Sequence, residues 1–318
     1  MNRVKLLLRT LALLIGLQPL GASADAPVIR LSLICGGMTP MIAQIGMNDG
    51  SFERAGLRVE KFCFPGGAPA VQALIGKSVD IFIGSYEHVL RQRARGFDVK
   101  AYGEIYDGMS YVLVAKTSSP LRGLADLKGQ TLGITAAGSL SDTALRQGLE
   151  SVRLNPDRDV QIVNAGTGST MFAALASNRI GAGMITEPAS TALVADGQYK
   201  ILYDNKSPFA GNVLMAGAGW VKTNHDQMRT LLTTLKQIDA RTRANPANAI
   251  APMRNDFPNV GPRIMLQAVQ HQLAHVPKGL IVTRSGTNVV SAIELREGSI
   301  KAPIPYDQAV DLSLLGGR

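Results

Sequence analysis

The sequence predicts an α/β protein built as two similar lobes. Apolar segments rich in Val, Ile and Leu alternate with helical segments, as in mostly parallel sheets. The order of strand, glycine loop and helix recurs about 101 residues later, which places Leu31 on Leu132 and Gly67 on Gly168. A chain of 318 residues is also long enough for two domains. The recurrence reflects either an internal repeat or convergent patterning, and both alternatives give two lobes in series.

The first residues have the pattern of a secretory signal peptide. Two basic residues, Arg3 and Lys5, precede a leucine-rich stretch, and Gly21-Ala22-Ser23-Ala24 forms an Ala-x-Ala cleavage site. We therefore expect residues 1–24 to be removed after Ala24 and the protein to be periplasmic. The net charge of +9 then falls to +6, because three basic residues and no acidic residue leave 30 against 24. No later run reaches about 18 apolar residues, so we do not expect the mature chain to span a membrane.

The first half of the mature chain alternates strands and helices. Gly36-Gly37 ends the first expected strand, and Pro40 suits the first turn of the helix that follows. Pro65-Gly66-Gly67 closes the second strand in the same way. The apolar patterns predict strands over residues 28–35, 57–64 and 79–83, and helices over residues 39–47 and 70–75.

The second half continues the alternation and then becomes mostly helical. Val, Ile and Leu runs predict strands over residues 111–115 and 199–203, and an apolar segment spans residues 213–221. Helical spacing of apolar residues predicts helices over residues 189–195, 229–244 and 264–275. Asn245-Pro246 ends the longest of these helices.

Composition and motifs exclude several function classes. Aromatic residues are 5% of the chain, with a single Trp, which is too few for a platform that stacks nucleic-acid bases. We interpret Arg91, Arg93 and Arg95 as a solvated helix end and not as a nucleic-acid site.

The sequence patterns that resemble catalytic and metal-binding motifs are each incomplete. Gly76-Lys77-Ser78 lacks the glycine of a phosphate loop, because Val71 stands there. His271 and His275 are four residues apart but lack the adjacent Glu of a metalloprotease. We therefore predict no catalytic residue, no metal and no cofactor.

Small and polar residues follow six of the expected strands. In an open α/β sheet, ligands bind beyond the carboxyl ends of the strands, and free N–H groups at helix starts favour an anion. Gly, Ser and Thr are also common at any turn from strand to helix, so one such loop proves little. Six loops in two lobes indicate a single cleft that gathers them: those at residues 36–39, 65–67, 84–86, 138–141, 166–169 and 186–188.

Four segments resemble the periplasmic substrate-binding proteins of ABC importers, in the branch that binds nitrate, sulfonates, taurine and thiamine precursors. These segments are residues 49–60, 73–81, 124–130 and Glu187-Pro188. The resemblance implies a type II fold, with one lobe from residues 25–108 and 210–318 and the other from residues 109–209. It implies a monomer that captures a small organic anion or polar metabolite between its lobes, closes, and delivers it to a membrane permease without catalysis.

The resemblance also implies which loop residues bind the ligand. Tyr86 would stack on the ligand or donate through its hydroxyl, or else pack within its lobe. Glu187 would meet a cationic group or orient hydroxyl donors, or else serve only the turn before Pro188. Thr186 stands where sulfonate binders often carry an aromatic residue, which weakens a sulfonate assignment. The implied binding residues are Met38, Thr39, Gly67, Ala68, Ser85, Tyr86, Ser139, Leu140, Thr167, Ser169, Thr186 and Glu187.

Two cysteines end strands that should be neighbours. Adjacent strands lie about 4.8 Å apart, within reach of a disulfide, and exported proteins fold in an oxidising compartment. Cys35 and Cys63 therefore form a disulfide or remain as two buried thiols.

Two other functions are compatible with the same fold. Relatives include enzymes of thiamine-pyrimidine and menaquinone synthesis, although the export signal and the incomplete motifs argue against an enzyme. A ligand-sensing receptor that serves a signalling partner would look the same in sequence.

Overall fold

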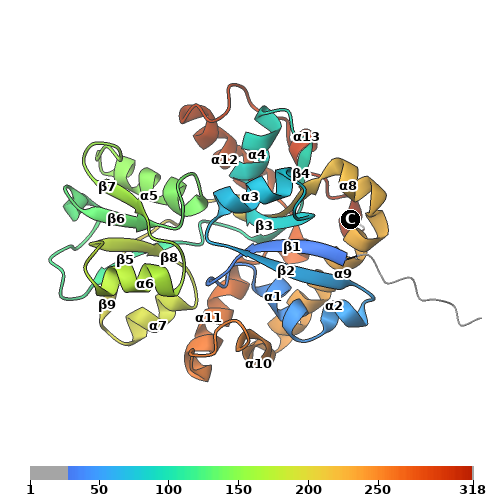
Figure 1. Cartoon of the computed structure of the whole chain (residues 1–318), viewed down its shortest axis with the longest axis horizontal. Helices are drawn as coiled ribbons and strands as arrows, with labels where there is room; N and C mark the ends of the chain where they lie inside the picture. The colour runs from blue at the N-terminus through green and yellow to red at the C-terminus, as the bar shows by residue number, and fades with distance from the viewer. Residues whose placement is uncertain (1–27, 317–318) are drawn as a thin grey trace, which may run out of the picture.

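The computed structural model describes residues 28–316, so the expected signal peptide lies outside the described residues. Two five-stranded sheets form two lobes side by side (Figure 1). The first sheet has the order β2-β1-β3-β10-β4 and the second β7-β6-β8-β5-β9. In each sheet four strands point the same way, and β10 or β5 runs antiparallel to its two neighbours. The prediction of a two-lobed α/β fold with mostly parallel sheets is confirmed.

The strands of each sheet come from different parts of the chain. The first sheet contains β1 Val28–Ile34, β2 Arg58–Phe64, β3 Ile81–Ser85, β4 Val99–Tyr106 and β10 Asn212–Gly217. The second contains β5 Val112–Lys116, β6 Thr131–Ile134, β7 Gln161–Asn164, β8 Ala182–Ile185 and β9 Tyr199–Asp204. Residues 107–111 and 205–211 therefore run between the sheets. We propose the lobe boundaries given above on the same basis.

Helices cover both faces of each sheet (Figure 1). In the first lobe, one face carries α3 Gly67–Ile75, α4 Glu87–Ala94, α12 Arg284–Arg296 and α13 Tyr306–Ala309. The other face carries α1 Met41–Asn48, α2 Ser51–Arg54, α9 His225–Ala244, α10 Ile250–Met253 and α11 Pro262–His275. α8 Ala218–Thr223 follows β10. In the second lobe, α5 Leu140–Ser151 lies on one face, and α6 Ser169–Ala176 and α7 Ala189–Ala195 on the other.

Apolar periodicity explains why these helices pack where they do. Along α9, Met228, Leu231, Leu235 and Ile238 recur at helical spacing, and all are fully buried. They join the core between β1 and the helices on that face. Within residues 28–316, no helix is long and apolar enough to cross a bilayer.

Two local features shape the cleft side of the first lobe. Strand β3 begins two residues later than the apolar pattern predicts. Just before it, the Asp80 N–H donates to the Arg30 carbonyl at 2.8 Å, and the Asp80 carboxylate pairs with the Arg30 guanidinium at 2.6 Å. Ser85 is the last residue of β3 and not the first of a loop. A disulfide joins Cys35 to Cys63, with 5.3 Å between the Cα atoms, and ties the ends of β1 and β2.

Candidate functional site

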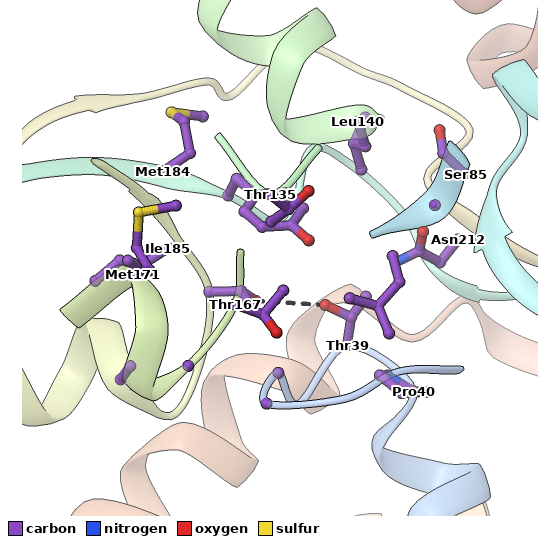
Figure 2. A pocket seen from close by; sticks show the side chains of 18 of the residues that line it. Thr39, Pro40, Ser85, Thr135, Leu140, Thr167, Met171, Met184, Ile185 and Asn212 are labelled. Carbon is purple, nitrogen blue, oxygen red and sulfur yellow. Dashed lines mark hydrogen bonds between the residues drawn. The ribbon is translucent and has the colours of Figure 1, made fainter. Parts of the chain in front are cut away.

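A small cavity lies between the two lobes, at the carboxyl ends of β1, β3, β6 and β8. Its volume is about 30 Å³, enough for one or two waters. Residues from both sheets face each other across it (Figure 2). The lining residues are Ile34, Gly36, Gly37, Thr39, Pro40, Gly67, Ile83, Ser85, His88, Tyr111, Thr135, Leu140, Thr167, Gly168, Met171, Met184, Ile185, Thr186, Ala189 and Asn212.

Hydrogen bonds between the lobes hold this arrangement closed. The Met38 N–H donates to the Glu187 carbonyl at 2.7 Å. The Thr167 hydroxyl donates to the Cys35 carbonyl at 2.7 Å. The hydroxyls of Thr39 and Thr186 lie 3.3 Å apart. Each bond joins the loop after a strand of one lobe to a loop of the other, so the structure is that of a closed cleft.

Glycine permits this close approach at Gly37. A Cβ there would lie 2.6 Å from Cγ2 of Thr186, on the opposite lobe. Any larger residue at this position would separate the lobes or displace Thr186, because real Cβ atoms do not approach so closely. The glycine loop after β1 is therefore needed for closure itself.

The structure places half of the residues implied by the sequence against the cavity. Met38 lies in the core, and Ser139 accepts a hydrogen bond from the Ala68 N–H at 3.1 Å, across the lobes. Ser169 is exposed at the start of α6. Of the twelve implied residues, six line the cavity: Thr39, Gly67, Ser85, Leu140, Thr167 and Thr186.

Tyr86 and Glu187 lie outside the cavity. Tyr86 is 1% exposed and packs in the core of the first lobe, and burial raises the pKa of its hydroxyl. Glu187 accepts a hydrogen bond from Thr191 at 2.9 Å and pairs with His271 of the first lobe at 3.1 Å. It lines a separate groove beside the two crossing segments. In this closed structure, Glu187 therefore serves contact between the lobes.

Among the polar residues of the lining, sequence reasoning missed His88, Tyr111, Thr135 and Asn212. His88 lies in the first turn of α4, three residues after Ser85. This spacing from a residue at the end of a strand was the only sequence signal that His88 faces the cavity. Asn212 begins β10 opposite Ser85, so an antiparallel strand brings its first residue to the edge where parallel strands end. No sequence pattern shows that β10 pairs with β3.

Gly67 makes room for His88. A Cβ on Gly67 would lie 2.5 Å from Nε2 of the imidazole. His88 is 2% exposed, and its Nε2 has no hydrogen-bond partner among the described residues. Burial, with the nearby Arg91 and Arg95, lowers the pKa of His88 to about 3, so the imidazole is neutral.

The expectation that Arg91 is solvated is wrong. Its side chain is 15% exposed and donates two hydrogen bonds to Glu294, at 2.6 and 2.8 Å. It also donates to the Gly138 carbonyl of the second lobe at 2.8 Å. Packing of α4 against α12 buries the guanidinium, which the sequence of three closely spaced arginines does not reveal.

The polar groups that residues 28–316 contribute to the lining of the cavity are hydroxyls, one amide and one imidazole, and none of them is a charged side chain. In the part of the chain that is described, no cluster of three or more His, Cys, Asp or Glu residues is arranged to hold a metal ion. The side chains of the lining therefore offer hydrogen-bonding groups and apolar surface.

Two α/β lobes that close over a lined cavity define the fold of the periplasmic binding proteins. Solved structures with this fold include a protein of Bordetella bronchiseptica RB50, 20% identical, with a TM-score of 0.81 over 92% of this chain and 96% of that one. The alkanesulfonate-binding protein SsuA of Xanthomonas axonopodis pv. citri, bound to MOPS, is 19% identical, with a TM-score of 0.73 over 91% and 99%. The desulfurization enzyme DszB is 15% identical, with a TM-score of 0.65 over 91% and 97%.

The sequence also matches a family model. The model described as NMT1/THI5 like covers residues 41–249, and the chain therefore belongs to the NMT1/THI5-like family. Among curated proteins, none matches this sequence. The structural similarities are all below 25% identity here, so they support the fold, while the family model covers most of the chain.

Proposed function

We propose that this protein is a periplasmic solute-binding protein that captures a small organic anion or polar metabolite and delivers it to an ABC permease. One observation carries the proposal: a cavity is lined from both lobes and sealed by hydrogen bonds between them. A ligand that contacts both lobes stabilises the closed state over an open one, which is hinge closure. The SsuA neighbour, which is bound to MOPS, is an example of this fold with an organic ligand.

The crossing segments provide the hinge in this proposal. The Gly108 N–H donates to the Phe209 carbonyl at 2.8 Å, so the two segments are bonded to each other. The backbone of Gly211 is bonded on both sides. Its carbonyl accepts from the Tyr86 backbone N–H at 2.9 Å, and its N–H donates to the Glu104 carboxylate at 2.8 Å. Few residues therefore need to change conformation for the lobes to separate.

Binding is tested by calorimetry and thermal unfolding with residues 25–318. We expect one class of small organic compounds to bind and to raise the unfolding temperature, since a ligand at 100 times its Kd stabilises by about 2.7 kcal/mol. Mass spectrometry of the compound after incubation should show no turnover. Conversion of the compound would instead indicate an enzyme, as for the DszB neighbour.

A glycine pair provides the matched control. Gly37→Val places methyl groups against Thr186 of the other lobe and should weaken binding strongly. Gly123→Val adds the same side chain in the second lobe, where no atom lies within 4 Å of a Cβ, and should bind normally. Equal affinity of both variants would contradict binding in this cleft. Delivery predicts that the liganded protein stimulates ATP hydrolysis by its permease in proteoliposomes.

A further inference from the structure

The cavity has one wall with unused hydrogen-bonding groups, which we call the polar wall: Ser85, His88 and Asn212. The hydroxyl of Ser85 and Nε2 of His88 are buried without a partner among the described residues, and both side chains are 2% exposed. Asn212 stands opposite Ser85 in the antiparallel pair of β10 and β3 (Figure 2). Buried polar groups are normally paired, so groups left unpaired in a cavity indicate a ligand that pairs them.

The opposite side of the cavity carries an apolar patch beside the hydroxyls of Thr135, Thr167 and Thr186. Met171, Met184 and Ile185 of the second lobe form this patch, which we call the apolar wall (Figure 2). All three side chains are buried. Methionine side chains adapt to irregular shapes, so these three residues fit the apolar part of an organic molecule.

The lining residues described provide no charged side chain that could neutralise a charged ligand. Between residues 28 and 316, no Asp, Glu, Lys or Arg lines the cavity. Arg91, one turn beyond His88, already pairs with Glu294 at 2.6 Å and lies 3.6 Å from Glu87. A buried charge without a counterion is strongly disfavoured, whether it is an anion or a cation.

Two of the helix starts beside the cavity, those of α3 and α5, already have partners for an N–H group. The Ala68 N–H at the start of α3 already donates to Ser139 at 3.1 Å. At the start of α5, the Gly138 N–H donates to the Asp142 carboxylate at 2.8 Å, which also offsets the helix dipole. These two N–H groups are therefore not available to an anion.

We propose that the ligand is a small uncharged organic molecule whose hydrogen-bonding group meets the polar wall and whose apolar part packs on the apolar wall. The cavity has room for only one or two waters in this structure, so the lobes stand further apart when the ligand is bound. This rests on the proposed function and selects the polar metabolite over the organic anion. Alcohols, carboxamides and neutral nitrogen heterocycles have the required chemistry, since each offers both a hydrogen-bonding group and apolar carbon. Nitrate, sulfate and alkylammonium ions do not.

The test compares compounds that share a skeleton and differ in charge. Calorimetry with benzamide, benzyl alcohol, benzoate and benzylammonium, and with butyramide and butyrate, measures affinity for the wild-type protein. We expect an uncharged member to bind and its charged counterparts to bind at least about tenfold more weakly. Binding of charged members alone, or with equal affinity, overturns this inference and leaves the proposed function intact. Absence of binding by every compound also overturns this inference, while the wider set of compounds described above tests the proposed function separately.

Variants of the polar wall locate the contact. Ser85→Ala and His88→Met should each weaken the uncharged compound about tenfold, because each leaves a ligand group unpaired. Ser32→Ala is the matched control, since it removes a fully buried hydroxyl that bonds the Ile81 carbonyl within the same sheet, away from the cavity. Should His88→Met fail to fold, Ser85→Ala decides. Unchanged affinity in Ser85→Ala overturns the assignment.

Discussion

Arg91 offers the sharpest test of how the closed structure is stabilised. Its guanidinium pairs with Glu294 at 2.6 Å and lies 3.6 Å from Glu87, and both carboxylate side chains are 0% exposed. Arg91→Met keeps much of the side-chain volume but removes the charge. Breaking a buried ion pair from one side costs about 3–5 kcal/mol, because it leaves an uncompensated buried charge.

Arg93 provides a control on the same helix. It donates to Asp98 at 2.8 Å, but that carboxylate is 67% exposed, so water replaces the partner when the arginine is lost. Such exposed pairs contribute about 0–1 kcal/mol. We therefore expect Arg91→Met to lower the free energy of unfolding by about 3 kcal/mol more than Arg93→Met.

Urea unfolding followed by tryptophan fluorescence measures both variants, since Trp220 is the single tryptophan of the sequence. A second change, Glu294→Met, in the Arg91→Met background should recover part of the loss, because an apolar pair replaces the ionic pair. The reasoning fails if Arg91→Met destabilises no more than Arg93→Met, which would mean that the buried carboxylates do not depend on the guanidinium.

Three further predictions concern the hinge, the pH dependence and the disulfide. Gly211→Ala places a Cβ against the carbonyl oxygens of Tyr106 and Gly108, so we expect a destabilised or opened protein with a larger radius of gyration in small-angle scattering. Gly219→Ala, where no atom lies within 4 Å of the added Cβ, should fold normally. Burial raises the pKa of Glu104 from 4.5 to about 8, so its contribution to stability is full below pH 4.5 and is lost as the pH rises through 8. Glu104→Gln should flatten that decline in urea unfolding across this range, and an unchanged slope would contradict the assignment. Replacing Cys35 and Cys63 with serine opens a loop with a sequence separation of 28 residues, which should lower the free energy of unfolding by about 3–4 kcal/mol; a loss below about 1 kcal/mol would show that the folded ends of β1 and β2 need no tether.

The sequence by itself determined the lobes and the loops that face the cleft. Strand and helix periodicity depends on neighbours along the chain, and so does the glycine that ends a strand. Local sequence is therefore sufficient to place Thr39, Thr167 and Thr186 at strand ends, and all three line the cavity. The position of Cys35 and Cys63 at the ends of adjacent strands follows from the same local pattern.

Only the tertiary structure decided which side chains reach the cavity. Asn212 arrives there because β10 pairs antiparallel with β3, a pairing between residues more than a hundred positions apart. Arg91 is buried because α12, near the end of the chain, packs on α4. Glu187 is directed away from the cavity to His271 by contact between the lobes. These outcomes depend on contacts between distant segments, and sequence periodicity carries information only about which face of a local element is apolar.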